Sequence, residues 1–186
     1  MRKRVFIIHR WSGSPHTDWY PWFQRELEAR GYEVFVPAMP HPETPTIEDN
    51  VVCLSEAVGV PDEQTHFVGH SIGCQTIMRY LAGIQTRVGK VVFVAPWFDL
   101  KGLEDEEVAA IAKPWIETPI DFGRIRQNAQ DITAVFSDDD NYVDLGNKEL
   151  FEKNLNLKIF VEHKKGHFTE ESGITELPIV LEQFVE

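Results

Sequence analysis

Residues 69–73 read Gly-His-Ser-Ile-Gly, and this is the most informative stretch of the chain. The Gly-x-Ser-x-Gly pattern is typical of a sharp turn from a strand into a helix, which holds a serine hydroxyl up at the end of a sheet. The glycines suit such a turn because the flanking backbones approach too closely for side chains. Ser71 would then stand at a helix N-terminus, where free N–H groups stabilise negative charge.

The sequence on either side of Ser71 supports this turn. Residues 64–69 read Gln-Thr-His-Phe-Val-Gly and predict a short strand, and residues 72–82 place apolar side chains near helical spacing. The alternative is a tight turn that carries a solvated serine, which needs neither a strand before it nor a helix after it. We therefore interpret Ser71 as a candidate nucleophile.

Short apolar runs rich in Val, Ile and Phe alternate with helix-like stretches along the whole chain. Continuous apolar runs suit strands that are buried on both faces of a parallel sheet. The alternation predicts an α/β fold with right-handed crossovers. The predicted strands are 4–8, 33–36, 65–69, 90–95, 132–136 and 157–161, and the predicted helices are 19–30, 46–58, 72–83, 144–155 and 174–185.

Local signals mark some helix ends and loops. Gly31 is a candidate C-cap for the first helix, and Thr46 is a candidate N-cap for the second, with Asp49 in its first turn. Four prolines make residues 37–45 a loop. Residues 96–130 lie between two predicted strands, and we interpret them as a long crossover rather than a cap domain.

Length and composition narrow the class of protein. The 186 residues predict a single domain over 1–186, and the net charge of −12 disfavours nucleic acid and anionic membrane surfaces as partners. The apolar run at Val5–Ile8 is too short for a signal peptide, and Cys53 and Cys74 give no disulfide framework. We expect a cytoplasmic protein, a monomer or homodimer, with no cofactor and no metal.

A nucleophilic serine needs a base within hydrogen-bond reach, and in a nucleophile-elbow fold the chain order is serine, acid, histidine. Only His163 and His167 follow Ser71 in the sequence. His163 ends the last predicted strand, whereas His167 lies in a loop in which Gly166 permits a turn and Phe168 can pack. We choose His167 as the base, with His163 as the alternative.

Three consecutive aspartates, Asp138, Asp139 and Asp140, follow a predicted strand. A solvated turn is one interpretation, because aspartate favours turns. A calcium loop starting at Asp138 is excluded, since Tyr142 and Val143 replace an oxygen ligand and the required glycine. The third interpretation is that one of the aspartates orients the base, which fits the strand position and the chain order.

Backbone donors and an acyl pocket complete the candidate site. The N–H of Ile72 follows the nucleophile, and a second donor would come from residues 9–14, after the first strand.

Aromatic residues on predicted loops, Trp11, Trp97, Phe98 and Phe168, line an acyl pocket or, alternatively, only cover the sheet. Arg10 would bind a substrate carboxylate or, alternatively, form a surface ion pair.

Several segments together resemble the small α/β-hydrolases of the retinoblastoma-binding-protein-9 and YdeN type, which are single-domain serine hydrolases without a large cap. The resemblance implies an α/β-hydrolase fold with about six mainly parallel strands and helices on both faces. It favours Asp140 as the acid, because Val143 supplies the small apolar residue three positions later, and it implies Trp11 N–H as the second oxyanion donor. The segments are 8–15 (Ile-His-Arg-Trp-Ser-Gly-Ser-Pro), 19–23 (Trp-Tyr-Pro-Trp-Phe), Met39-Pro40, 69–73, 137–140 (Ser-Asp-Asp-Asp) and 166–168 (Gly-His-Phe).

The chain departs from this family at two places. Arg10 stands where these hydrolases usually have glycine, which puts a long cation beside the expected oxyanion site. The Leu-x-Cys-x-Glu motif of the animal members is absent, because the residues around Cys53 read Val-Val-Cys-Leu-Ser. A retinoblastoma-binding role is therefore not expected.

The residues and the resemblance together predict a serine hydrolase that cleaves small acyl esters. Ser71, His167 and Asp140 would form the catalytic triad, and the reaction would pass through an acyl-enzyme. The alternatives are an amidase or aminopeptidase with the same triad, and a non-catalytic protein-interaction member of the fold. The expected partner is a small-molecule ester.

Overall fold

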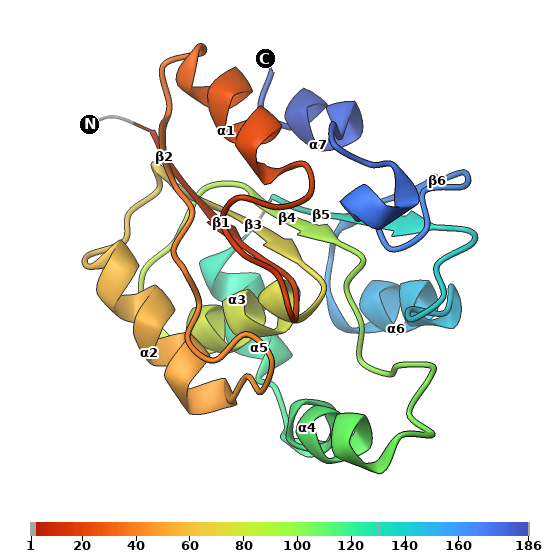
Figure 1. The fold of residues 1–186 in the computed structure, drawn as a ribbon. Helices are drawn as coiled ribbons and strands as arrows, with labels where there is room; N and C mark the ends of the chain where they lie inside the picture. Colours follow the sequence, from red (N-terminus) through yellow and green to blue (C-terminus); the bar gives the residue numbers. More distant parts are fainter. Residues whose placement is uncertain (1–2, 130, 186) are drawn as a thin grey trace.

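The computed structural model describes residues 3–129 and 131–185 and contains a six-stranded sheet in the order β2-β1-β3-β4-β5-β6 (Figure 1). Every pairing in this sheet is parallel, which confirms the predicted α/β architecture. The strands are β1 (Arg4–Ile8), β2 (Glu33–Phe35), β3 (Thr65–His70), β4 (Val91–Val94), β5 (Ile132–Ser137) and β6 (Lys158–Glu162).

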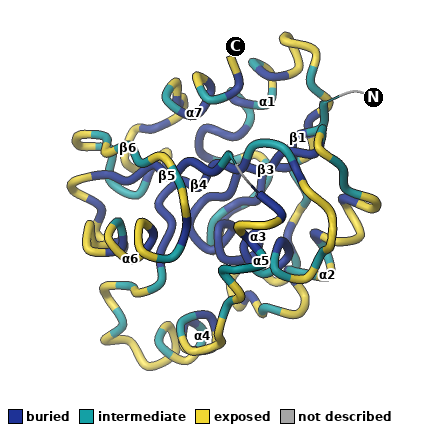
Figure 2. The backbone as a smooth tube through the Cα atoms, turned by 180° about the vertical axis from the view of Figure 1, so that it is seen from behind, coloured by how far each residue is buried: buried dark blue, intermediate teal, exposed yellow. Residues whose placement is uncertain are grey.

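The central strands form the core because their residues are apolar on both faces. All residues of β3, β4 and β5 are buried, as are all but the first of β1. Figure 2 shows this buried centre and the more exposed outer helices and edges. β6 is an edge strand whose residues are exposed or half-buried.

Helices cover both faces of the sheet (Figure 1). α1 packs against α7 on one face, and α3 contacts both α2 and α5 on the other. The helices are α1 (Tyr20–Glu28), α2 (Ile47–Val58), α3 (Ile72–Gly83), α4 (Glu106–Glu117), α5 (Phe122–Asn128), α6 (Gly146–Asn154) and α7 (Pro178–Glu182), with a 3-10 turn η1 at Glu170–Ser172.

Helix ends agree less well with the sequence predictions. Thr46 is the N-cap of α2 and its side chain accepts a hydrogen bond from Asp49 N, as predicted. The Gly31 prediction was wrong, because α1 ends at Glu28 with Ala29 as its C-cap and Gly31 turns the chain two residues later at φ +86°. The last helix is shorter than predicted because it starts at Pro178, where a missing N–H costs nothing in a first turn.

The long crossover between β4 and β5 contains α4 and α5. α4 lies outside the layer that α2, α3 and α5 form on the sheet (Figure 1). β2 pairs with one edge of β1, and β3 pairs with the opposite edge of β1. The order in which successive strands are added to the sheet therefore reverses direction at β1. Ligand sites in open α/β sheets lie outside the carboxyl ends of strands at such a point.

Candidate active site

Ser71 occupies the turn between β3 and α3, with φ +54° and ψ −116°. This conformation is uncommon for a residue with a side chain. A Cβ on Gly69 would lie 2.7 Å from Cys74 N, and a Cβ on Gly73 would collide with the Ile8 carbonyl oxygen. The two glycines therefore permit the close approach of β1, β3 and α3 that holds Ser71 in place.

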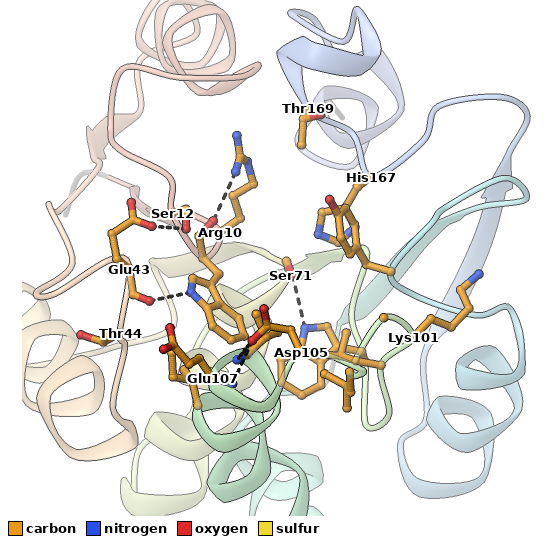
Figure 3. A pocket seen from close by; sticks show the side chains of 18 of the residues that line it. Arg10, Ser12, Glu43, Thr44, Ser71, Lys101, Asp105, Glu107, His167 and Thr169 are labelled. Atoms are coloured by element: carbon orange, nitrogen blue, oxygen red, sulfur yellow. Dashed lines mark hydrogen bonds between the residues drawn. The ribbon is translucent and has the colours of Figure 1, made fainter.

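The Ser71 hydroxyl accepts a hydrogen bond from the indole Nε1 of Trp97 at 3.3 Å. Trp97 follows β4 and its side chain is buried. Within residues 3–129 and 131–185, no hydrogen bond joins Ser71 Oγ to His167. Both side chains nevertheless line one cavity, and Figure 3 shows His167 near Ser71.

His167 is held by Asp140, whose Oδ2 lies 2.8 Å from His167 Nδ1. The Asp140 side chain is 1% exposed and its Oδ1 accepts hydrogen bonds from Tyr142 N and Val143 N at 2.8 and 3.0 Å. A carboxylate only accepts, so Nδ1 carries the proton in this bond, and Nε2 is the ring atom that has a lone pair in the neutral tautomer. The Tyr142 ring packs edge-on against His167 with centroids 5.1 Å apart.

The neighbouring aspartates bind other parts of the same loop. Asp138 lies 2.5 Å from His163 Nδ1 and accepts from Lys164 N at 2.9 Å, and these contacts lower its pKa. Asp139 accepts from Ser137 Oγ and from Gly166 N, each at 2.8 Å, which lowers the pKa of that carboxyl. The alternative base, His163, is 74% exposed and does not line the cavity.

The sequence predicts Trp11 N and Ile72 N as the two backbone donors of an oxyanion hole. In the part of the chain that the structure describes, neither Trp11 N nor Ile72 N donates a hydrogen bond. Trp11 is fixed by its indole N–H, which donates to Glu43 O at 3.0 Å. Arg10 lies outside the left-handed region, so a non-glycine residue is accommodated there without backbone strain.

The Arg10 guanidinium faces an aspartate rather than open solvent. Its Nε donates to Asp18 Oδ2 at 2.8 Å, and the two side chains are 14% and 0% exposed. The pairing neutralises the cation beside the candidate oxyanion site. Of the two interpretations of Arg10, the ion pair is the one observed, although the residue also lines the cavity.

The cavity has a volume of about 610 Å³ and opens beside Ser71 (Figure 3). Arg10, Trp11 and Trp97 are among its lining residues. Phe98 stacks on Phe151 with centroids 4.1 Å apart, and Phe168 is fully buried, so neither of these aromatic residues lines the cavity.

Crossover residues complete the cavity wall: Leu100, Leu103, Val108 and Ile111 supply apolar surface that the sequence did not indicate. Four carboxylate side chains also line it, from Glu43, Asp105, Glu107 and Glu171. In the described ranges, no group of three or more His, Cys, Asp or Glu side chains is arranged to hold a metal ion. No helix in those ranges is long and apolar enough to cross a membrane.

Residues 5–186 match the serine hydrolase family. The chain belongs to this family. It is 30% identical to the Bacillus subtilis protein YdeN, over 97% of this chain and 93% of that protein. It is a hydrolase by this relationship, and the resemblance drawn from the sequence is confirmed.

Solved structures confirm the α/β-hydrolase fold of this serine hydrolase. The crystal structure of the B. subtilis ydeN gene product superposes with a TM-score of 0.88 at 27% identity, covering 99% of this chain and all of that one (100%). Est1E from Butyrivibrio proteoclasticus, solved with ferulic acid bound, gives a TM-score of 0.71 at 16% identity, covering 98% of this chain and 90% of its own.

Sequence reasoning missed three buried polar residues around this site. Asp18, Tyr20 and His70 are each 5% exposed or less and hydrogen-bond to the loops that carry Arg10 and His167. His70 is the variable residue inside the Gly-x-Ser-x-Gly motif, and a polar residue there, at the end of an apolar strand, was the available signal.

Proposed function

We propose that this serine hydrolase cleaves small acyl esters by two-step acyl transfer, with Ser71 as nucleophile, His167 as general base and Asp140 as the acid that orients the base. One observation carries the proposal: the buried Asp140 holds His167 Nδ1 at 2.8 Å, beside a cavity that also contains the strained Ser71. This arrangement supports the order of roles in a serine, histidine and acid triad.

The proton path follows from the hydrogen bonds. His167 Nε2 would take the Ser71 proton as Oγ attacks the ester carbonyl, and would return it to the leaving alcohol. Asp140 would stabilise the imidazolium that forms, because its Oδ2 already accepts from Nδ1. Water activated by the same nitrogen would then release the acyl group. The turn from β3 to α3 keeps Oγ fixed during both steps.

The carbonyl oxygen would bind between Trp11 N and Ile72 N, which have no other partner in the described ranges. The cavity of about 610 Å³ is partly lined by Trp11, Trp97 and aliphatic side chains of the crossover, which suits a short acyl chain. Both features support a small ester as substrate.

A fluorophosphonate probe tests the proposal directly. We expect covalent labelling of Ser71, measured by mass spectrometry of the tryptic peptide, and no labelling of Ser71→Ala. We also expect faster hydrolysis of p-nitrophenyl acetate than of amino-acid p-nitroanilides. Comparable turnover of the anilides would instead favour an amidase, and an unlabelled wild-type protein would favour a non-catalytic member of the fold.

A further inference from the structure

Two loops must meet for the proposed chemistry, and they come from opposite ends of the chain. We call residues 9–13, after β1, the oxyanion loop, and residues 163–170, after β6, the histidine loop. Arg10 belongs to the first and His167 to the second. Two separate chains of hydrogen bonds connect the loops, and both begin at Arg10.

The first connection runs through the protein interior. Arg10 N lies 3.2 Å from Tyr20 OH, and Tyr20 OH lies 2.6 Å from His70 Nδ1. His70 Nε2 lies 2.8 Å from the carbonyl oxygen of His167. Both the Tyr20 and the His70 side chain are fully buried. The backbone of the proposed general base is therefore tied to the oxyanion loop through the residue that precedes Ser71.

The donor and the acceptor of each hydrogen bond between Arg10 N and His167 O follow from the chemistry of these two end groups. The His167 carbonyl can only accept, so His70 Nε2 carries a proton and donates it. Burial lowers the pKa of His70 well below its usual range, so Nδ1 is unprotonated and accepts from the Tyr20 hydroxyl. The Tyr20 oxygen in turn accepts from Arg10 N–H. Every donor in this hydrogen-bond network faces an acceptor, which fixes the orientation of the His70 ring.

The second connection uses the Arg10 side chain. Its Nε donates to Asp18 Oδ2 at 2.8 Å, and Asp18 Oδ1 accepts from Glu170 N at 2.9 Å. The Asp18 side chain is 0% exposed, and its backbone lies in the left-handed region at φ +57°. A buried carboxylate needs such partners, because leaving it unpaired is costly. Asp18 therefore joins the oxyanion loop to the residue three positions beyond His167.

From these contacts we infer that Arg10, with Asp18, Tyr20 and His70, is a positioning unit that sets the oxyanion donor at Trp11 and the base His167 at their working separation around Ser71. The inference rests on the proposed function. It gives a role to the arginine that replaces the usual glycine: glycine would keep the N–H that bonds Tyr20 but would lose the side chain that bonds Asp18. A cation in that position then belongs to the scaffold of the site and not to substrate binding.

The test compares three disrupting variants with a matched control and with the conservative variant Arg10→Lys. Arg10→Gln and Asp18→Asn each break the ion pair, and Tyr20→Phe breaks the interior chain while keeping its ring. Arg4→Gln is the control, since Arg4 also donates three hydrogen bonds, to Val58 O, Val60 O and Thr65 Oγ1, but from the other end of β1. Each protein is assayed for kcat and KM with p-nitrophenyl acetate and for its thermal midpoint.

We expect Arg10→Gln, Asp18→Asn and Tyr20→Phe each to lower kcat about 10- to 100-fold, because small misplacements of catalytic groups have effects of that size. KM should change less than about threefold, since none of these substitutions alters the tryptophan and aliphatic side chains that line the cavity. Arg4→Gln should lower the thermal midpoint but keep kcat within about twofold, as expected of a change remote from the reacting atoms. Arg10→Lys should recover part of kcat because it restores the charge opposite Asp18.

Folded Arg10→Gln and Tyr20→Phe proteins with a wild-type kcat would overturn the positioning unit while leaving the proposed function intact. Should one variant not fold, the other two decide the question in the same way. A wild-type protein that the fluorophosphonate probe does not label at Ser71 would overturn the proposed function, and the positioning role with it.

Discussion

The adjacent aspartates Asp138, Asp139 and Asp140 have different hydrogen-bond partners, and these partners predict how much each carboxylate contributes to kcat. Asp140 bonds the His167 ring, whereas Asp138 bonds Lys164 N and the exposed His163. We expect Asp140→Asn to lower kcat about 10³- to 10⁴-fold, because an amide no longer holds the required histidine tautomer. Asp138→Asn should stay within about threefold, since its remaining oxygen still accepts from Lys164 N. Steady-state kinetics on both variants measures this, and the reverse order would refute the assignment of Asp140.

Trp97 is the one side chain that donates to Ser71 Oγ in the described ranges, at 3.3 Å. An indole N–H can only donate, so it binds a lone pair of Ser71 Oγ and orients the hydroxyl group. We expect Trp97→Phe to slow labelling of Ser71 by the fluorophosphonate about 3- to 10-fold, the effect of one ordinary hydrogen bond. Trp115→Phe is the matched control, because its indole N–H donates to Pro45 O. Equal labelling rates for the two variants would show that the Trp97 donor is not used.

The strand, turn and helix around Ser71 form one rigid element whose geometry depends on Gly73. A Cβ there would meet the Ile8 carbonyl oxygen, which β1 holds in the sheet, whereas a Cβ on Gly83 at the other end of α3 meets nothing within 4 Å. We expect Gly73→Ala to lower the free energy of unfolding by about 3 kcal/mol, as other overpacked sites do. Gly83→Ala should change it by less than about 1 kcal/mol. Urea unfolding measures both, and similar values would contradict a packing constraint at the turn.

Elements with a strong local pattern could be predicted from the sequence, and contacts between distant segments could not. The apolar strands and the N-cap Thr46 have signals within a few residues, and the structure bears them out. The C-cap prediction at Gly31 was wrong because a helix can end several residues before the glycine at which the chain turns. Chain order was enough to select Ser71 and His167 as candidates. The bond from Glu170 N to Asp18 left no pattern, because these two residues meet only when β1 and β6 join one sheet.

Charge over the molecule as a whole should influence which esters enter the cavity. The net charge is −12, and Glu43, Asp105, Glu107 and Glu171 line the cavity. The Arg10 cation there is paired with Asp18. We expect kcat/KM for p-nitrophenyl butyrate to exceed that for the mono-p-nitrophenyl ester of succinate about 5- to 10-fold at low salt, because a like-charged cleft repels the carboxylate.

This preference should shrink as salt screens the charges, since the Debye length falls to about 3 Å at 1 M ionic strength. Glu171→Gln, which changes a residue that lines the cavity, should reduce the ratio of the two kcat/KM values at low salt. Glu26→Gln on the surface of α1 should leave that ratio unchanged. Faster cleavage of the succinate ester would show instead that a cation in the cavity recognises the carboxylate.

Buried neutral histidines should make the folded protein sensitive to acid. Burial, aided by the charges of Lys3 and Lys90, lowers the pKa of His66 to about 4, and burial also lowers the pKa of His9 and His70. Below pH ~6.5 these histidines are protonated in the unfolded chain but stay neutral in the folded protein. Their contribution to the free energy of unfolding is therefore full above that pH and is lost as the pH falls toward 4. For His66 alone the loss between pH 7 and pH 5 should be on the order of 2 kcal/mol. His66→Asn keeps an acceptor for Lys90 N but cannot titrate, so urea unfolding of this variant should show that much less dependence on pH. The exposed His16→Asn is the control, and an equal pH dependence in both variants would show that His66 titrates normally in the folded protein.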